Sequence, residues 1–449
     1  MDHHTTKNNR QPNRLGFHYF PDCIHYTEKD IQRWLPILKE IKAQWLVIKS
    51  PVNRAVPEDF IHSLSANGIN LLIDFNLPLA GEIAWHDLEL LISSYSKWGA
   101  KFAMLNQHPN QKSSWTNGQW GNPDLIDSVV SQFIRFGSVC LENSIRPIFP
   151  LLTPGGDYWD LAFLKIALSK LKDDAPLAVL NNFILSAVAW DWGKPLDWGA
   201  GGQERWPKVK PYKLPEKSQN QLGFRTFEWY APIAREVFGK TIPILLLQAG
   251  ISGNPQNAEA KAQAADLEKI LAIYRLLKGE NVYDALDGSH LFQPILSDII
   301  GCCFYLLASD SPDLQACQWY SADGQRFPPA QAFYIREQIH QEEKALSEPE
   351  ESQPMVNYQH NRYVLIAYDL QPETPRLLEL LHPYIEKFSP MIGFSAAEAQ
   401  KSAVILAIAP ANRPEPPEFE LIQNNGSLVK IIHPGEITAY LKEQDYANQ

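Results

Sequence analysis

The sequence predicts an α/β protein, a (β/α)8 TIM barrel followed by a small α/β domain. Eight short apolar segments alternate with longer amphipathic stretches over most of the chain, which is the pattern of repeated β-α units around a parallel sheet. Eight such units over roughly three hundred residues match a closed barrel. The composition then changes near Ile339, and a shorter set of strand and helix patterns follows.

Each expected barrel strand is a short apolar run, typical of a strand that is buried on both faces. In chain order the runs are Leu15–Phe20, Trp45–Lys49, Asn70–Phe75, Lys101–Leu105, Arg146–Leu151, Asn182–Ala187, Pro243–Leu247 and Ile299–Leu306. The stretches between them show helical spacing of apolar residues and predict helices, among them Glu28–Ile41, Leu125–Cys140 and Ala258–Leu277. A doubly wound open sheet would show the same alternation, but eight consecutive units favour the barrel.

The domain organisation follows from composition. Residues 1–14 are polar and predict a disordered tail, residues 15–338 the barrel, and residues 339–357 a linker, because HQEEKALSEPEESQPMVNYQHN is charged and poor in large apolar residues. Residues 358–449 predict a small domain that could bind a ligand or simply pack. Its expected strands are Tyr363–Tyr368, Ala403–Ile408 and Leu428–Ile432, with helices near Pro375–Phe388, Ser395–Ser402 and Glu436–Glu443.

Charge and cysteine content exclude several function classes. The formal net charge of -11 gives no general attraction to nucleic acid or to an anionic membrane, so neither is an expected partner.

No segment has the uninterrupted apolar length of a membrane span, and the polar start MDHHTTKNNRQPNR lacks a signal-peptide core. We expect a cytoplasmic protein, or one that reaches the surface without a cleaved signal. The five cysteines, with Cys302 and Cys303 in an apolar run, predict reduced, buried thiols.

Two strand ends carry recognisable motifs, because the fourth strand ends in MLNQHPNQKSSW and the seventh reads PILLLQAGISG. These motifs resemble the Asn-Glu-Pro-Asn and Thr-Glu-x-Gly endings of clan A glycoside hydrolases, in particular β-xylosidase-like barrels. The segments GDYWDLAFLKIAL, GFRTFEWYAPIAREVFGKTIPI and SADGQRFPPAQAFY extend the resemblance over most of Leu15 to about Tyr334. The resemblance implies that Gln107 replaces the acid/base glutamate and Gln248 the nucleophile. Asn106 matches the family's asparagine, and His108 is an extra residue before Pro109-Asn110.

The substitutions predict a barrel without its catalytic pair. A retaining glycosidase needs two carboxyl groups about 5 Å apart, one to protonate the leaving oxygen and one to attack the sugar. An amide has no titratable proton and a weakly nucleophilic oxygen. Neither Lys101–Pro123 nor Thr241–Ala258 contains Asp or Glu, so a shift of register restores neither carboxylate. We therefore expect no catalytic residues, only the degenerate positions Gln107 and Gln248.

A sugar could still bind in the cleft, because loop tryptophans can pack on pyranose rings while amides and carboxylates orient the hydroxyls. The alternative is that loop tryptophans pack only against their own loops, that Asp157 caps a helix beginning at Tyr158 or Trp159, and that Asp74 orients a neighbour. The expected substrate-binding residues are Asn106, Gln107, Trp115, Asp157, Trp159, Trp190, Asp191, Trp192, Trp198 and Gln248.

Two functions remain open at this point. The first is a non-catalytic barrel that binds an oligo- or polysaccharide or is reused as a scaffold for a protein partner. The second is an active glycoside hydrolase with relocated carboxylates, of which Asp191 is the best placed. No cofactor and no metal are expected, because no His/Cys/carboxylate set has zinc spacing and Gly199–Gly202 lacks the setting of a nucleotide loop.

The C-terminal domain resembles bacterial cell-wall-binding repeats in the runs YIEKFSPMIGFSAAEA and SAVILAIA. This resemblance implies a bacterial protein with a wall or polysaccharide partner. A packing or oligomerisation module is the alternative.

Overall fold

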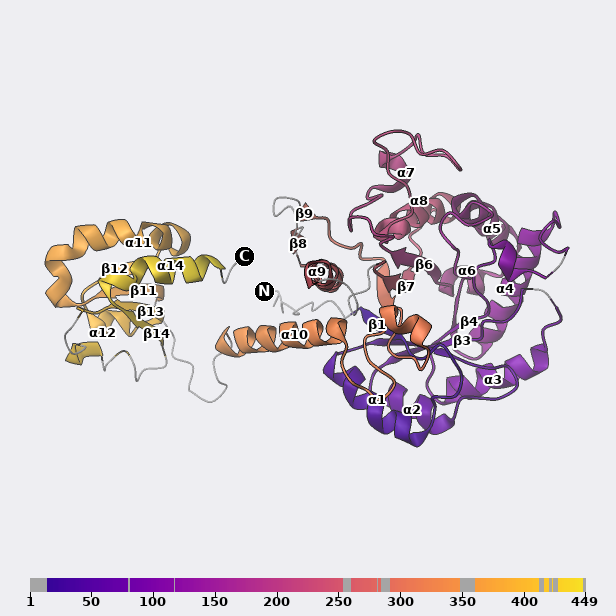
Figure 1. The fold of residues 1–449 in the computed structure, drawn as a ribbon, viewed down its shortest axis with the longest axis horizontal. Helices are drawn as coiled ribbons and strands as arrows, with labels where there is room; N and C mark the ends of the chain where they lie inside the picture. The colour runs from indigo at the N-terminus through magenta and orange to yellow at the C-terminus, as the bar shows by residue number, and fades with distance from the viewer. Residues whose placement is uncertain are drawn as a thin grey trace, which may run out of the picture. The chain divides into compact units, whose positions relative to one another are not determined.

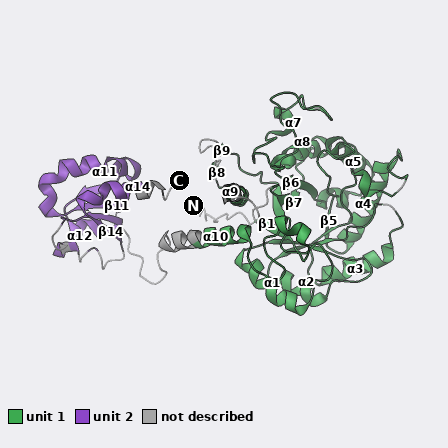
Figure 2. Cartoon of the chain, in the orientation of Figure 1, with its two compact units in different colours: residues 1–341 green, residues 342–449 purple. Residues whose placement is uncertain are grey.

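A computed structural model of the chain describes residues 14–79, 81–116, 118–252, 260–280, 282–283, 291–347, 360–411, 416–419, 422 and 427–446. The chain divides into two compact units between Gln341 and Glu342 (Figures 1 and 2). The tail expected over residues 1–14 lies, except for Arg14, outside the described residues.

Eight parallel strands form the barrel of unit 1. Their order is β5-β4-β3-β2-β1-β10-β7-β6. Each barrel strand therefore pairs with the barrel strand before or after it in the chain, and the first strand, β1, pairs with the last, β10. The two ends of this order meet at a bridge between Ile148 and Ile184, where the backbone N–H of Phe149 donates to the carbonyl of Ile184 at 2.8 Å. The predicted TIM barrel is confirmed. The strands are β1 (Leu15–His18), β2 (Trp45–Lys49), β3 (Asn70–Asp74), β4 (Phe102–Met104), β5 (Arg146–Ile148), β6 (Leu185–Trp190), β7 (Ile244–Gly250) and β10 (Ile299–Phe304).

Helices surround the strands (Figure 1). Helix α1 begins where Thr27 and Asp30 form a capping box, which satisfies backbone N–H groups of the first turn. The helices of the unit are α1 (Glu28–Glu40), α2 (Glu58–Ala66), α3 (Trp85–Lys97), α4 (Leu125–Glu142), α5 (Asp160–Asp174), α6 (Leu177–Asn182), α7 (Gly202–Arg205), α8 (Phe227–Phe238), α9 (Ala260–Leu277) and α10 (Pro328–Ser347). Short 3-10 turns are η1 (Lys112–Ser114), η2 (Phe224–Thr226) and η3 (Pro312–Cys317).

The core of unit 1 has two layers, because successive strand residues face opposite sides of the sheet. In β2, Leu46 and Ile48 face the helices, and Trp45 and Val47 face the barrel interior. The interior is so tightly filled that a Cβ added at Gly301 would lie 2.7 Å from the indole nitrogen of Trp45. The inner layer therefore closes the barrel below its carboxyl-end mouth.

Several element boundaries in unit 1 differ from the sequence expectation, and two of these differences have a clear cause. β6 begins at Leu185 rather than Asn182, because the short helix α6 follows Pro176 and uses the preceding residues. Helix α10 continues to Ser347, through residues expected to be linker from position 339. These residues are mostly Gln, Glu, Lys, Ala and Leu, which favour helix, and no proline interrupts them before Pro349. The rest of the expected linker, from residue 348, lies outside the described residues. A hairpin of β8 (Val282–Tyr283) and β9 (Leu291–Phe292) was also not expected.

Unit 2 is a parallel sheet of order β12-β11-β13-β14 with its own apolar core. The extra strand β12 escaped prediction because it has only three residues. The expected helix Ser395–Ser402 is reduced to α12, because Ser402 already belongs to β13. The elements are β11 (His360–Ile366), η4 (Tyr368–Glu373), α11 (Thr374–Phe388), β12 (Met391–Gly393), α12 (Ala396–Ala399), β13 (Ser402–Ile408), η5 (Pro417–Phe419), β14 (Leu428–Ile432), η6 (Pro434–Glu436) and α14 (Ile437–Tyr446).

Within the described part of the chain, no helix is both long and apolar enough to cross a membrane. The five cysteines carry free thiols, and Cys140, Cys302 and Cys303 are buried.

Candidate functional site

The mouth of the barrel is lined by residues at the carboxyl ends of the strands. Trp45 and Val47 belong to the interior cluster, so Lys49, two residues further along β2, faces the mouth. In the same way Leu72 is interior, and Asp74 ends β3 on the same face. The ladder pairs Lys49 directly with Asp74. The mouth therefore carries one cationic and one acidic residue on adjacent strands.

Asp74 holds Gln107 in place. The carboxyl group is 1% exposed; its Oδ1 accepts the backbone N–H of Asn76 at 3.1 Å, and its Oδ2 accepts Nε2 of Gln107 at 2.6 Å. Burial raises the pKa of Asp74 to about 6, although the charge of Lys49 and the two hydrogen bonds act in the opposite direction. Of the two roles considered for Asp74, orienting a neighbour and contacting a ligand, the structure shows the first.

The turn after β4 positions Gln107 and the extra residue His108. Gln107 forms a parallel bridge with Leu151, which continues the pairing of the fourth and fifth barrel strands. His108 adopts a left-handed φ of 56°, its backbone N–H donates to the carbonyl of Leu151 at 2.6 Å, and its Nδ1 lies 2.9 Å from the Thr153 hydroxyl. Burial, and then the charge of Lys49, lower the pKa of His108. The imidazole is therefore neutral at pH 7.

Gln248 lies in β7, the seventh barrel strand. The pairing of β6 with β7 skips one residue, because Ala187 pairs with Leu246 and Val188 with Gln248. This bulge at Leu247 puts Gln248 on the face of Val188, whose side chain belongs to the interior cluster. Gln248 is half-buried, and no hydrogen bond to its side chain is found among the described residues. Gln107 thus follows the fourth barrel strand and Gln248 lies in the seventh, and their approach across the mouth stays a prediction.

The bulge also engages His18 at the end of β1. Nε2 of His18 donates to the carbonyl of Leu247 at 2.5 Å, and its ring meets that of Tyr305 edge-on at 5.3 Å. Burial lowers the pKa of His18 to about 4. His18 is therefore a neutral donor that fixes the bulge beside Gln248.

Trp190 ends β6 at the mouth and Trp192 follows it, and both side chains pack against the interior cluster. Trp190 is half-buried, its indole N–H donates to the Ser252 hydroxyl at 3.1 Å, and its ring covers Gly250 so closely that a Cβ there would lie 2.3 Å from Cζ3. Trp192 has a left-handed φ of 46°. These two are the expected tryptophans that the structure brings to the barrel interior.

Asp191, between these tryptophans, has a structural role. It is 1% exposed; Oδ1 accepts the backbone N–H groups of Gly193 and Ser252, and Oδ2 pairs with Nζ of Lys269 at 2.7 Å. Both oxygens are therefore occupied by contacts that join the loops after β6 and β7 to α9. This arrangement leaves no oxygen free for chemistry on a sugar.

Asn106 and Trp115 face away from the interior of the barrel. Nδ2 of Asn106 lies 3.5 Å from Oε1 of Gln132 on α4, and its buried Oδ1 has no partner among the described residues. The indole N–H of Trp115 donates to the carbonyl of Pro109 at 2.9 Å.

The capping role considered for Asp157 is wrong. Helix α5 begins at Asp160 with Trp159 as its N-cap, and no side chain caps it. Asp157 instead accepts the backbone N–H of Lys112 at 2.8 Å, which ties together the loops after β4 and β5. Trp198 lies in the loop after β6, where its indole N–H donates to Oδ1 of Asn220 at 3.0 Å.

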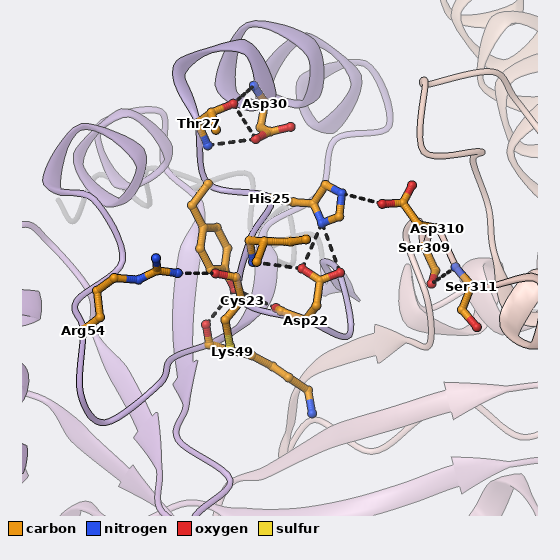
Figure 3. A network of polar contacts seen from close by, with 12 residues as sticks. Asp22, Cys23, His25, Thr27, Asp30, Lys49, Arg54, Ser309, Asp310 and Ser311 are labelled. Carbon is orange, nitrogen blue, oxygen red and sulfur yellow. Dashed lines mark hydrogen bonds and ion pairs between the residues drawn. The ribbon is translucent and has the colours of Figure 1, made fainter.

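A further polar cluster on the loops was not expected (Figure 3). Nδ1 of His25 lies 2.9 Å from Oδ1 of Asp22, and Nε2 lies 2.9 Å from Oδ2 of Asp310, so one imidazole joins the loops after β1 and β10. The ring stacks on Phe20 at 3.9 Å. Sequence gave no signal for this contact, because Asp310 is far from His25 in the chain.

The residues that sequence reasoning missed at the mouth are His18 and Lys49. Both stand at inward positions of strands that were predicted correctly, so the two-residue period of the strands was the usable signal. Within the described ranges, no three His, Cys, Asp or Glu side chains are grouped so that they could hold a metal ion.

No family model matches the chain, and no curated protein matches it in sequence. Among solved structures, an endo-β-1,3-glucanase from Sorangium cellulosum is 12% identical, with 72% of this chain and 97% of that chain covered and a TM-score of 0.41. A monomeric β-xylosidase from Caulobacter crescentus is 11% identical, with 73% and 68% covered and a TM-score of 0.44. A Saccharomyces cerevisiae Gas2p mutant in complex with laminaritetraose and laminaripentaose is 11% identical, with 74% and 64% covered and a TM-score of 0.43.

Proposed function

We propose that unit 1 binds a carbohydrate at the barrel mouth without hydrolysing it. The observation that carries this proposal is the pair of amides, Gln107 and Gln248, at the ends of the fourth and seventh barrel strands. Their positions are those at which the resemblance to clan A glycoside hydrolases implies the two catalytic carboxylates. Glutamine keeps the length and hydrogen-bonding reach of glutamate, so the shape of a sugar site can persist after the chemistry is lost.

The surroundings of the two amides support binding rather than turnover. Asp74 accepts from the amide nitrogen of Gln107 and so fixes the orientation of that side chain. The carbonyl oxygen of Gln107 can then accept a hydrogen bond from a sugar hydroxyl. Trp190 supplies a half-buried aromatic side chain at the end of β6. An aromatic ring next to oriented amides is the combination that suits a pyranose.

Hydrolysis by relocated carboxylates is the second candidate, and Asp74 rather than Asp191 now supports it best. Its pKa of about 6 suits a general acid near neutral pH. A partner carboxylate is still required, and both oxygens of Asp191 are engaged elsewhere. Asp74 is the only acidic residue on the eight described barrel strands, and this favours binding.

The test combines hydrolysis and binding assays. A panel of aryl glycosides is offered to the wild type, Gln107→Glu, Gln248→Glu and the double variant, and oligosaccharide binding is measured by calorimetry. We expect no turnover by the wild type or by either single variant, and a trace from the double variant, because only that variant has both carboxyl groups.

Trp190→Ala should weaken sugar binding about tenfold, equivalent to roughly 1.4 kcal/mol. Trp98→Ala, at the C-terminal end of α3, is the matched control and should not. Wild-type turnover that Asp74→Asn or Asp191→Asn abolishes would establish the relocated mechanism instead. If no sugar binds, the proposal fails, and a scaffold for a protein partner takes its place.

A further inference from the structure

Lys49 stands at the mouth, and no partner for its ammonium group lies among the described residues. Its position at the end of β2 follows the inward residues Trp45 and Val47, and it is half-buried. In Figure 3 its side chain extends away from the cluster of His25 and Asp22. No hydrogen bond or ion pair to its ammonium group is found within the described part of the chain.

This isolation is unusual for the barrel, because other half-buried lysines contact an oxygen. The contacts join Lys170 to Asp127, Lys194 to the carbonyl of Leu222, Lys269 to Asp191 and Lys278 to Glu337. A half-buried ammonium group loses hydration, and a paired anion or a hydrogen-bond acceptor normally compensates for that loss.

The groups around Lys49 do not neutralise it by contact. Its charge acts on His18, Asp74 and His108, which come from β1, β3 and the turn after β4. Both histidines are neutral near pH 7. Asp74 pairs with Lys49 in the ladder, but its two oxygens already accept from Asn76 and Gln107. The mouth thus presents a cation beside Asp74, whose carboxyl oxygens accept from a backbone N–H and from the amide of Gln107.

We propose that Lys49 receives a carboxylate of the sugar, so that the barrel mouth selects oligosaccharides that contain a uronic acid. The inference rests on the proposed carbohydrate-binding function and names its ligand class. Asp74 on the adjacent strand is ionised above about pH 6, but both of its oxygens accept from other donors, so the ammonium group of Lys49 is left to pair with one monovalent carboxylate. Sulfate and phosphate groups are usually held by several cations or by the fork of an arginine.

The test uses oligosaccharides of glucuronate, galacturonate or mannuronate, each paired with its carboxyl-reduced, neutral counterpart. Binding of both members is measured by calorimetry to the wild type, to Lys49→Met and to Lys112→Met. Lys112 is an exposed lysine of η1 in the loop after β4, so its variant removes the same charge outside the mouth. Circular dichroism confirms that each variant is folded.

The expected result is that the acidic member of one pair binds the wild type at least about tenfold more tightly than the neutral member. Lys49→Met should remove that difference, so that both members bind alike, and Lys112→Met should retain it. Equal binding of both members, or a difference that survives in Lys49→Met, overturns the inference but leaves the proposed function intact. A stronger preference for sulfated oligosaccharides overturns the choice of a carboxylate. If no sugar binds, the proposed function and this inference fail together.

Discussion

At the scale of single residues, an amide at a strand end is useful only if something orients it. Gln107 has such a support in Asp74, whose carboxyl oxygen accepts its Nε2 at 2.6 Å. Sequence could identify the amide, since it follows a recognisable strand, and it could name Asp74 as a strand-end acid. It could not supply their contact, because that contact depends on how β3 and β4 are staggered in the barrel. Similarly, the position of Asp191 at a strand end indicates an available carboxylate, but Lys269, far along the chain, pairs with it.

Asp74 should make the protein less stable as the pH rises. Burial raises its pKa to about 6 from an ordinary value of 3.8, so the folded state holds the proton more tightly than the unfolded chain. The stability that this proton contributes is fully present below about pH 4 and is lost as the pH passes 6. Asp74→Asn keeps a neutral side chain at every pH. The free energy of unfolding of the variant, relative to that of the wild type, should therefore rise by about 2–3 kcal/mol between pH 4 and pH 8. Urea unfolding at both values measures this. A difference that is the same at pH 4 and pH 8 would contradict the assignment.

Gly250→Ala should displace Trp190 from the mouth. The added Cβ would lie 2.3 Å from the ring of Trp190, whose indole N–H donates to the Ser252 hydroxyl. We expect a loss of sugar affinity similar to that of Trp190→Ala, with destabilisation of about 1–3 kcal/mol from overpacking. Calorimetry and thermal unfolding give the two quantities. Gly121→Ala is the control, because nothing lies within 4 Å of a Cβ there. Unchanged affinity in Gly250→Ala would exclude Trp190 from the binding face.

At the scale of elements, α10 is joined to the barrel by Glu337. This buried residue accepts from the Tyr274 hydroxyl at 2.7 Å and pairs with Lys278 at 3.1 Å, both on or just after α9, and pairs with Lys42 after α1 at 2.6 Å. Three segments distant in the sequence thus meet at one carboxylate. The composition predicts a linker from residue 339. The contacts of Glu337 instead fix α10 just before that residue, and helix-forming residues extend the helix to Ser347.

Glu337→Gln should destabilise the barrel most at neutral pH. Burial acts to raise the pKa of Glu337, but the contacts with Lys42, Tyr274 and Lys278 outweigh it and lower the pKa to about 2. Because the ordinary value is 4.5, this stabilisation is present above about pH 4.5 and is lost as the pH falls toward 2. We expect the variant to lose about 2 kcal/mol at pH 7 and much less at pH 3, measured by urea unfolding.

The matched control for Glu337 is Glu40→Gln, which breaks the partly exposed pair with Arg326. Its cost should be at most about 0.5 kcal/mol at pH 7. Equal costs for the two variants would show that Glu337 is no more important than an ordinary surface pair.

At the scale of the whole molecule, the barrel was predictable because each strand carries its own local signal. Trp45–Lys49 and Leu428–Ile432 were predicted with the bounds that the structure gives. What local patterns could not give are features set by distant partners. The bulge at Leu247, which His18 contacts, is one example. The three-residue strand β12, which pairs with β11 at the edge of its sheet, is another. The candidate site was therefore predictable as a set of strand ends but not as a set of contacts.

The two units should unfold as separate transitions. Each has its own apolar core, and all thirteen tryptophans precede residue 342, so tryptophan fluorescence reports on unit 1 alone. Far-UV circular dichroism, in contrast, reports on the helices of both units. We expect the fluorescence transition in urea to match that of a fragment of residues 1–347, and circular dichroism of the full chain to show a further transition that fluorescence does not. The fragment should also bind the same oligosaccharide with the same affinity, because every residue of the mouth lies within it. Coincident transitions by both probes, together with a fragment that fails to fold, would instead mean that unit 2 is an integral part of the barrel's stability.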